Sequence, residues 1–201
     1  MTPASHPEER CDTRTRILET AERLFRHYGY DKTTVADMAR DLGMSPANVY
    51  RFFGSKLEIV EAIAVRMFAE RHRVNVAILE SAGTAAERLH RFFCENHRLS
   101  VETLIGDRKV HDIVEVAMTQ QWESIENHLG QIADVIQALI EQGIAAGEFV
   151  AVADTRRAAI CARQSFVSLF HPTLIVQCGD DRERAGPEEL ADFILSALRR
   201  R

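Results

Sequence analysis

The chain has 201 residues, of which 46% are hydrophobic and 27% are charged, so it can form a sizeable core and its composition excludes disorder as the main state. It has no apolar run long enough to span a membrane, and residues 1–16 contain no apolar signal-peptide core. The four cysteines are widely separated, which is typical of reduced thiols rather than of a disulfide framework. We therefore expect a cytoplasmic protein without a membrane partner. The net charge of −5 hides a basic segment, because residues 10–56 hold nine Lys or Arg against six Asp or Glu.

Helical periodicity and helix-end signals divide the first part of the chain. Gly29 and Gly43 are candidate helix stops, and Ser45-Pro46 is a strong helix start, with serine as the N-cap and proline as the first helical residue. Thr33 or Thr34 can cap the helix before it. These signals predict a flexible arm at residues 1–12 and helices at about 13–28, 34–42, 46–53 and 55–76.

Longer helices are predicted in the second part. Thr84 and Glu87 form a capping-box pattern, Gly147 follows a long amphipathic stripe, and Asp154 can cap the next helix. The expected helices lie at about 84–104, 109–118, 124–146, 155–170 and 187–200. Because alternating β-branched runs are scarce, the predicted fold class is all-α, with about nine helices.

The segment from Thr33 to Lys56 has the pattern of a helix-turn-helix, two short helices joined by a turn that contains glycine. Such a pair can place the N-terminal end of its second helix in the major groove of DNA. The side chains near that end are short or form hydrogen bonds, as contacts to base edges and phosphates require. The predicted DNA contacts from this pattern are Ser45, Pro46, Ala47, Asn48, Tyr50 and Arg51, with Lys56 beyond the helix placed for a phosphate.

At these residues the sequence resembles the TetR family of transcriptional repressors. The matching stretches are Phe25 to Tyr30, Thr33 to Val35, Gly43 to Ser45 and Val49 to Phe53, followed by Ser55-Lys56. The resemblance implies that Thr34, Tyr50 and Lys56 meet phosphates and that residues 46–48 read bases, and Thr33 is included among the candidate DNA contacts. Packing of Tyr50 under the helix, simple capping by the threonines and an ordinary surface role for Lys56 are the structural alternatives. Phe52 departs from the family, where histidine is frequent.

For the rest of the chain, the resemblance implies a body at residues 57–201 that binds a small ligand and forms a homodimer, with the helix-turn-helix domain at residues 13–56. The expected partners are a palindromic double-stranded DNA operator, a second copy of the chain, and a small apolar or aromatic effector that releases the repressor from DNA. The candidate interface comprises Phe166, Val167, Phe170, Phe193, Ile194 and Leu198. Candidate pocket residues are Phe93, His97, Met118, Trp122 and Phe166. Ordinary core packing is the alternative for both sets.

The residues also bear on three other functions. His90, Cys94 and His97 share one helix face and could hold a metal with His111 or His128, which leaves a metal-sensing regulator of the same fold as an alternative. A protein-interaction module without DNA binding is a second alternative. The chain lacks glycine-rich phosphate loops and the common catalytic motifs, so we expect no enzyme activity, no cofactor and no resident metal.

Overall fold

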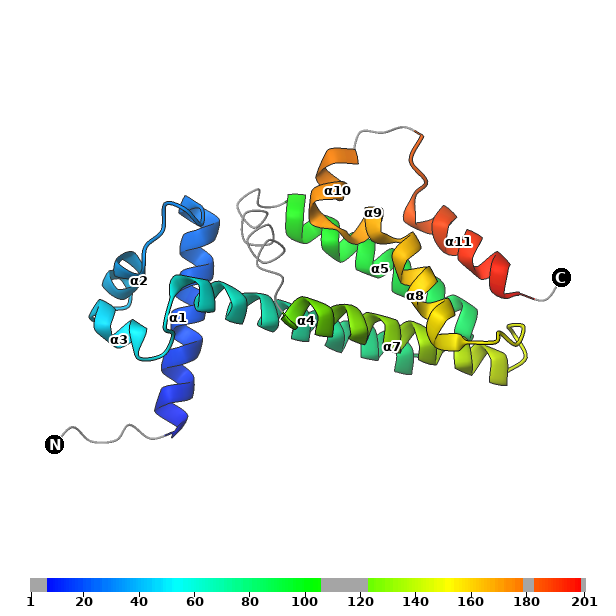
Figure 1. Ribbon diagram of the computed structural model, residues 1–201, viewed down its shortest axis with the longest axis horizontal. Coiled ribbons are helices and arrows are strands. Elements are labelled where there is room, and N and C mark those ends of the chain that lie inside the picture. Colours follow the sequence, from blue (N-terminus) through cyan, green and yellow to red (C-terminus); the bar gives the residue numbers. More distant parts are fainter. Residues whose placement is uncertain (1–6, 106–122, 179–182, 200–201) are drawn as a thin grey trace. The chain divides into compact units, whose positions relative to one another are not determined.

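The protein is described by a computed structural model that covers residues 7–105, 123–178 and 183–199. Over these residues the fold is helical, with one isolated backbone bridge between Phe149 and Arg199. This confirms the predicted all-α class, and the helix expected at 109–118 lies outside the described residues. The described helices are α1 (Pro7–Tyr28), α2 (Val35–Asp41), α3 (Pro46–Tyr50), α4 (Lys56–Glu80), α5 (Ala85–Ile105), α7 (Glu123–Ala145), α8 (Thr155–Ser165), α9 (Val167–Phe170), α10 (Pro172–Cys178) and α11 (Pro187–Leu198) (Figure 1).

The described residues form two compact units, one up to residue 67 and one from residue 68 onward, and α4 is a single helix that contributes to both. We call them the head unit and the body unit. The structural units divide after Met67, within α4. The predicted boundary between functional domains at residue 57 stays a prediction. Over the described residues, no helix is both long enough and apolar enough to cross a bilayer.

The head unit contains α1, α2, α3 and the first turns of α4. The apolar side chains at helical spacing are its core, and the following are fully buried: Ile17, Phe25, Met38, Val49, Ile59 and Ile63. Helix α1 begins at Pro7, about two turns before the predicted start near Thr13, and the predicted flexibility of residues 1–12 stays a prediction. Helix α3 ends at Tyr50, earlier than predicted, and a tighter turn follows in which the Phe52 amide donates to the Val49 carbonyl at 2.9 Å.

A glycine turn sets the direction in which α3 leaves α2. Gly43 has φ +65°, a left-handed conformation that glycine adopts without a Cβ clash. Its amide donates to the Arg40 carbonyl at 3.2 Å, and the Met44 amide donates to the Ala39 carbonyl at 2.9 Å. This pair of bonds is the Schellman motif, so the helix-turn-helix follows from a local helix-end signal.

In the body unit, α5 packs against α7, α9, α10 and α11, and α7 also packs against α8. Their shared core is apolar and includes the following fully buried side chains: Leu89, Phe92, Phe93, Ile136, Leu139, Ile140 and Phe166. The predicted helix at 155–170 is divided at Phe166, which lies between α8 and α9.

The Gly147-Glu148-Phe149 segment after α7 closes the body unit. Gly147 has φ +73°, which allows the chain to turn back, and the Phe149 ring then packs against Gly143. The Glu148 carboxylate accepts hydrogen bonds from the amides of Ala85 and Ala86, at 3.1 and 3.0 Å. These amides have no partner within α5, so a carboxylate from a distant segment caps that helix.

Candidate functional site

The surface formed by α3 and its flanks carries most of the predicted DNA contacts. The Ser45 hydroxyl accepts from the Asn48 amide at 3.3 Å, which caps α3, and Pro46 occupies the first turn. Tyr50 is 51% exposed, and Asn48 is partly buried beside Met44. The structure therefore brings the predicted residues of α3 onto one short, capped element, and these side chains are exposed: Ser45, Pro46, Ala47, Tyr50 and Arg51.

The two neighbouring threonines have different roles. Thr34 is exposed and caps α2, because its hydroxyl accepts from the Asp37 amide at 3.2 Å while the Asp37 carboxylate accepts from the Thr34 amide at 3.0 Å. The Thr34 hydroxyl also donates to the Asp37 carboxylate at 2.6 Å, and this bond, together with the one from the Thr34 amide, holds the pKa of Asp37 below its usual range. Thr33 is only 1% exposed and donates to the Gly29 carbonyl at 2.8 Å. The Thr33 hydroxyl is therefore buried inside the head unit and does not face solvent, whereas a DNA contact by Thr34 stays a prediction.

Lys56 lies against the loop that precedes α2. Its Nζ donates to the Tyr30 carbonyl at 2.5 Å and lies 3.8 Å from the centre of the Tyr30 ring. Burial lowers the pKa of Lys56, and nearby Asp31 partly opposes that shift. The ammonium has three donors, so a phosphate could still bind to the others.

Arg14 has a structural role that the sequence did not predict. Its Nη1 donates to the Phe52 carbonyl at 3.0 Å, and its guanidinium lies 4.1 Å from the centre of the Phe53 ring. The side chain thus holds the end of the helix-turn-helix against α1. Nothing in the local pattern could reveal this contact, because the hydrogen-bonded residues are 38 positions apart.

Two arginines near the head unit surface are paired with carboxylates. Arg40 contacts Asp37 at 2.5 Å, and Arg23 contacts Asp41. Exposed pairs of this kind contribute little to stability, but they reduce the positive charge that these arginines present. Arg51 is exposed, and no ion pair is seen for it within the described part of the chain. Its positive charge is therefore not offset by a carboxylate of the described residues.

The predicted pocket residues that the structure describes are packed against their neighbours. Phe93 and Phe166 are completely buried and stack with their ring centres 3.9 Å apart, and Phe170 lies 5.3 Å from Phe166. A ring nitrogen of His97 is 2.8 Å from the Leu169 carbonyl. These contacts make an aromatic core, the alternative that the sequence left open. The two remaining candidates, Met118 and Trp122, lie outside the described residues.

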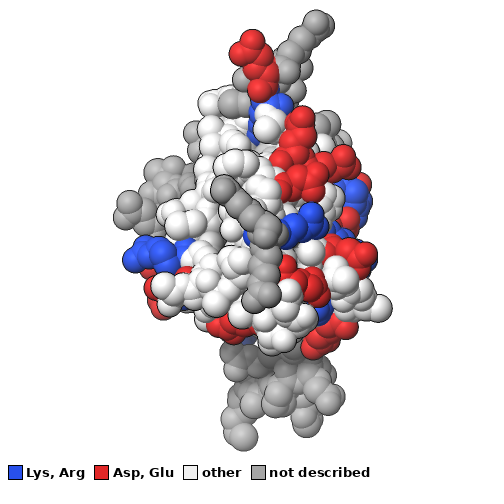
Figure 2. Space-filling model, turned by 90° about the vertical axis from the view of Figure 1, so that its right-hand side faces the viewer, with Lys and Arg blue, Asp and Glu red and all other residues white. Residues whose placement is uncertain are grey.

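Most of the predicted dimer residues also belong to the core of their own chain. Phe166, Ile194 and Leu198 are 0%, 8% and 6% exposed, so their own chain already buries them, and the interface itself stays a prediction. Apolar periodicity shows that a side chain is buried, but not whether its own chain or a second copy buries it. Val167 and Phe193 do face solvent, at 51% and 68% exposed. Figure 2 shows one face of the molecule, where a broad uncharged area lies beside acidic side chains.

The cysteine and histidine cluster on α5 gives no support to a metal site. Cys94 Sγ lies 3.7 Å from His90 Nδ1, whereas a ring nitrogen of His97 contacts the Leu169 carbonyl instead. Burial raises the pKa of Cys94, which disfavours the thiolate that a metal requires. Over the described residues, no three potential ligands come together, and His111 lies outside them. Of the other cysteines, Cys11 and Cys161 are exposed.

The fold and the exposed edge of α3 define a helix-turn-helix protein with a helical body. Residues 17–63 match the family described as bacterial regulatory proteins, tetR family, and residues 85–191, more than half of the chain, match the tetracyclin repressor-like C-terminal domain. The chain belongs to the TetR family, whose members are regulators rather than enzymes.

Three similar proteins illustrate this membership. The HTH-type transcriptional regulator TtgR of Pseudomonas putida is 41% identical over 56 residues, which cover 28% of this chain and 27% of TtgR. The biofilm operon icaADBC negative transcriptional regulator IcaR of Staphylococcus aureus is 27% identical over 63% of this chain and 65% of IcaR. The chain thus spans only about a quarter of TtgR and less than two thirds of IcaR. A putative regulator from Saccharomonospora viridis, solved with choline, shares the fold with a TM-score of 0.66 and 22% identity, over 95% of this chain and 100% of that one.

Proposed function

We propose that this protein is a transcriptional repressor that binds double-stranded DNA through α3. The observation that carries the proposal is the capped, exposed N-terminal end of α3, held at a fixed angle by the Gly43 turn. In this arrangement residues 45–48 face base edges, while Thr34, Tyr50 and Lys56 meet phosphates on either side. Thr33 is omitted because it is buried.

The family membership and the printed roles of relatives support the proposed repression. IcaR is named a negative regulator, and the fold of this chain is shared by a regulator solved with a small molecule. We therefore propose that a small ligand bound by the body unit lowers the affinity for DNA. Such a ligand must bind better to the conformation that does not bind DNA.

Two substitutions on α3 test the docking. Tyr50→Phe removes one hydroxyl from a phosphate contact and should weaken binding to all duplexes by about tenfold. Arg51→Ala should reduce the preference for the selected operator over random DNA by about tenfold or more, because a guanidinium can read guanine with two hydrogen bonds. Both effects are measured by fluorescence anisotropy with a duplex taken from the region upstream of the gene or selected from random DNA.

The matched control is Arg73→Ala, which removes an exposed cation from the part of α4 that belongs to the body unit. It should bind DNA like the parent protein. If the parent protein neither protects upstream DNA nor selects a palindrome, the DNA-binding proposal fails and the interaction-module alternative gains. If it binds but both α3 variants match it, the docking surface is wrongly assigned.

A second copy of the chain is proposed to pack on the exposed apolar residues of the C-terminal helices. Phe193→Glu places a charge at the most exposed large apolar side chain described and should convert a dimer into a monomer. The mass measured by sedimentation should halve, and the footprint should lose its symmetry. Val65→Glu, at an apolar residue of α4 that is 47% exposed, is the control and should remain dimeric. A monomeric parent protein, or a dimeric Phe193→Glu variant, would contradict this assignment.

A further inference from the structure

A group of polar side chains lies between the middle of α4 and the first turns of α7, within the body unit. The rings of Phe68 and His128 stack with their centres 4.2 Å apart. Arg71 and His72, on the next turn of α4, both act electrostatically on His128. Ser124 lies one turn before His128 and so shares its helix face. We call Arg71, His72, Ser124 and His128 the α4–α7 donor cluster.

The donor cluster contains polar atoms that the protein leaves without partners. The Nδ1 atoms of His72 and His128 and the Oγ of Ser124 are shielded from solvent, and none has a hydrogen-bond partner among the residues described. A buried polar group without a partner costs about 1–3 kcal/mol, and such groups are few in native proteins. His72 interacts electrostatically with His128, and Ser124 lies one helix turn before His128, so the three unpartnered groups belong to neighbouring turns of α4 and α7 and suggest that something else supplies acceptors to them.

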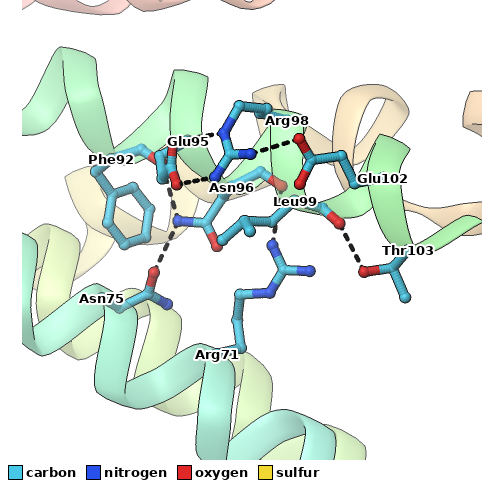
Figure 3. Close-up of polar contacts among 9 residues, drawn as sticks. All are labelled: Arg71, Asn75, Phe92, Glu95, Asn96, Arg98, Leu99, Glu102 and Thr103. Carbon is cyan, nitrogen blue, oxygen red and sulfur yellow. Dashed lines mark hydrogen bonds and ion pairs between the residues drawn. The ribbon is translucent and has the colours of Figure 1, made fainter.

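Arg71 adds a positive charge that has only a partial counter-charge. Its Nη1 donates to the Asn96 carbonyl at 3.1 Å, a neutral acceptor that α5 supplies (Figure 3). Glu95 is the nearby carboxylate, but both of its oxygens are held by Arg98, at 2.5 and 2.9 Å. Burial lowers the pKa of Arg71, and this effect exceeds the opposing influence of Glu95.

Polar contacts join α4 to α5 near the donor cluster, and apolar core side chains lie on the same helices. The Asn96 side chain donates to Asn75 at 2.8 Å and to the Phe92 carbonyl at 2.9 Å, which fixes α5 beside α4 (Figure 3). Phe92 and Ile132, one turn from Asn96 and His128 respectively, are part of the buried core. A ligand whose polar end meets the donor cluster would therefore place its remaining atoms beside apolar side chains.

We propose that the effector of this protein is a small apolar acid whose carboxylate is bound by Arg71, His72, Ser124 and His128. A carboxylate has about four acceptor positions, and the cluster offers a guanidinium, two ring N–H groups and one hydroxyl. This proposal rests on the ligand-responsive function proposed above. It adds the charge class of the ligand and the residues that recognise it.

The test compares acids with neutral molecules of the same shape. Hexanoate, octanoate, benzoate and phenylacetate are each titrated into the full chain beside their primary amides, with calorimetry and thermal unfolding as readouts. At least one acid should bind and raise Tm, and its amide should bind at least tenfold more weakly. Arg71→Met should weaken that acid at least tenfold, whereas Arg73→Met, which removes a neighbouring charge outside the cluster, should not.

The outcomes separate this proposal from the one on which it rests. DNA binding is measured on every variant, so loss of folding is distinguished from loss of the ligand contact, and His128→Gln replaces Arg71→Met if the latter does not fold. If acids and amides bind equally, if no acid binds, or if inorganic phosphate binds as tightly as the acids, the carboxylate proposal is overturned while the DNA-binding function stands. If an acid binds as expected but the parent protein does not bind DNA, the carboxylate proposal stands while the DNA-binding function is overturned.

Discussion

Gly143→Ala should lower the free energy of unfolding by about 3 kcal/mol, because an added Cβ would overlap a buried ring. A Cβ built at Gly143 lies 2.2 Å from Cδ2 of Phe149 and 2.3 Å from its Cε2. The Phe149 ring is 2% exposed, so it cannot move aside into solvent. Urea unfolding of the wild-type protein and the variant, monitored by circular dichroism, measures the difference.

Gly130→Ala is the matched control, because it makes the same substitution in the same helix. Nothing lies within 4 Å of a Cβ at Gly130, so the change should raise stability by up to about 1 kcal/mol through better helix propensity. Adding Phe149→Leu to Gly143→Ala should recover part of the loss by shortening the opposing side chain. A Gly143→Ala variant as stable as the wild-type protein would show that Phe149 does not pack against α7.

His128 should make the protein less stable in mild acid. Burial and the charges of Arg71 and His72 lower the pKa of His128 from 6.5 to about 4. In the unfolded chain His128 takes up a proton below about pH 6.5, whereas in the folded chain it does so only near pH 4. The free energy of unfolding therefore decreases as the pH is lowered from about 6.5 to about 4. Between about pH 7 and about pH 5 the His128 contribution should amount to a loss of about 2 kcal/mol.

Substitution of the histidine isolates this contribution from those of other groups. His128→Phe keeps a ring stacked on Phe68 but cannot titrate, so its stability should fall by about 2 kcal/mol less than that of the wild-type protein over the same pH range. His27→Gln removes an exposed histidine and should follow the wild-type protein. Equal pH dependence of wild-type protein and His128→Phe would mean that His128 is not buried as a neutral ring.

The parts of the head unit that depend on neighbouring residues were predicted from the sequence, while contacts between distant residues were not. Gly43 and Ser45-Pro46 act within one helix turn, so the turn and the start of α3 are visible in the sequence. Which of Thr33 and Thr34 is the exposed cap depends on which hydroxyl lies in the core. Local helix-capping patterns cannot distinguish the two threonines.

In the body unit, apolar periodicity predicts which side chains are buried but does not show which helix or chain buries them. Ile194 and Leu198 have the spacing of a helix interface and pack inside their own chain, whereas Phe193, beside Ile194, is exposed. The donor cluster was not predicted, because Arg71 and His128 meet only after α4 and α7 have packed. The sequence offers His128 only as a metal ligand by residue type, whereas the structure places Arg71 and His72 near it.

The cysteines allow a spectroscopic measurement of the conformational change that the proposed regulation requires. Cys11 lies in the head unit and Cys161 in the body unit, and both are exposed to labelling reagents. Cys94 should react more slowly with alkylating reagents, because burial raises its pKa and the thiolate is the reactive form. With Cys94 and Cys178 replaced by serine, a donor and an acceptor dye on the two native thiols would report the separation of head and body in solution. The same labelled molecule can then be followed by energy transfer as DNA, and afterwards an organic acid, is added.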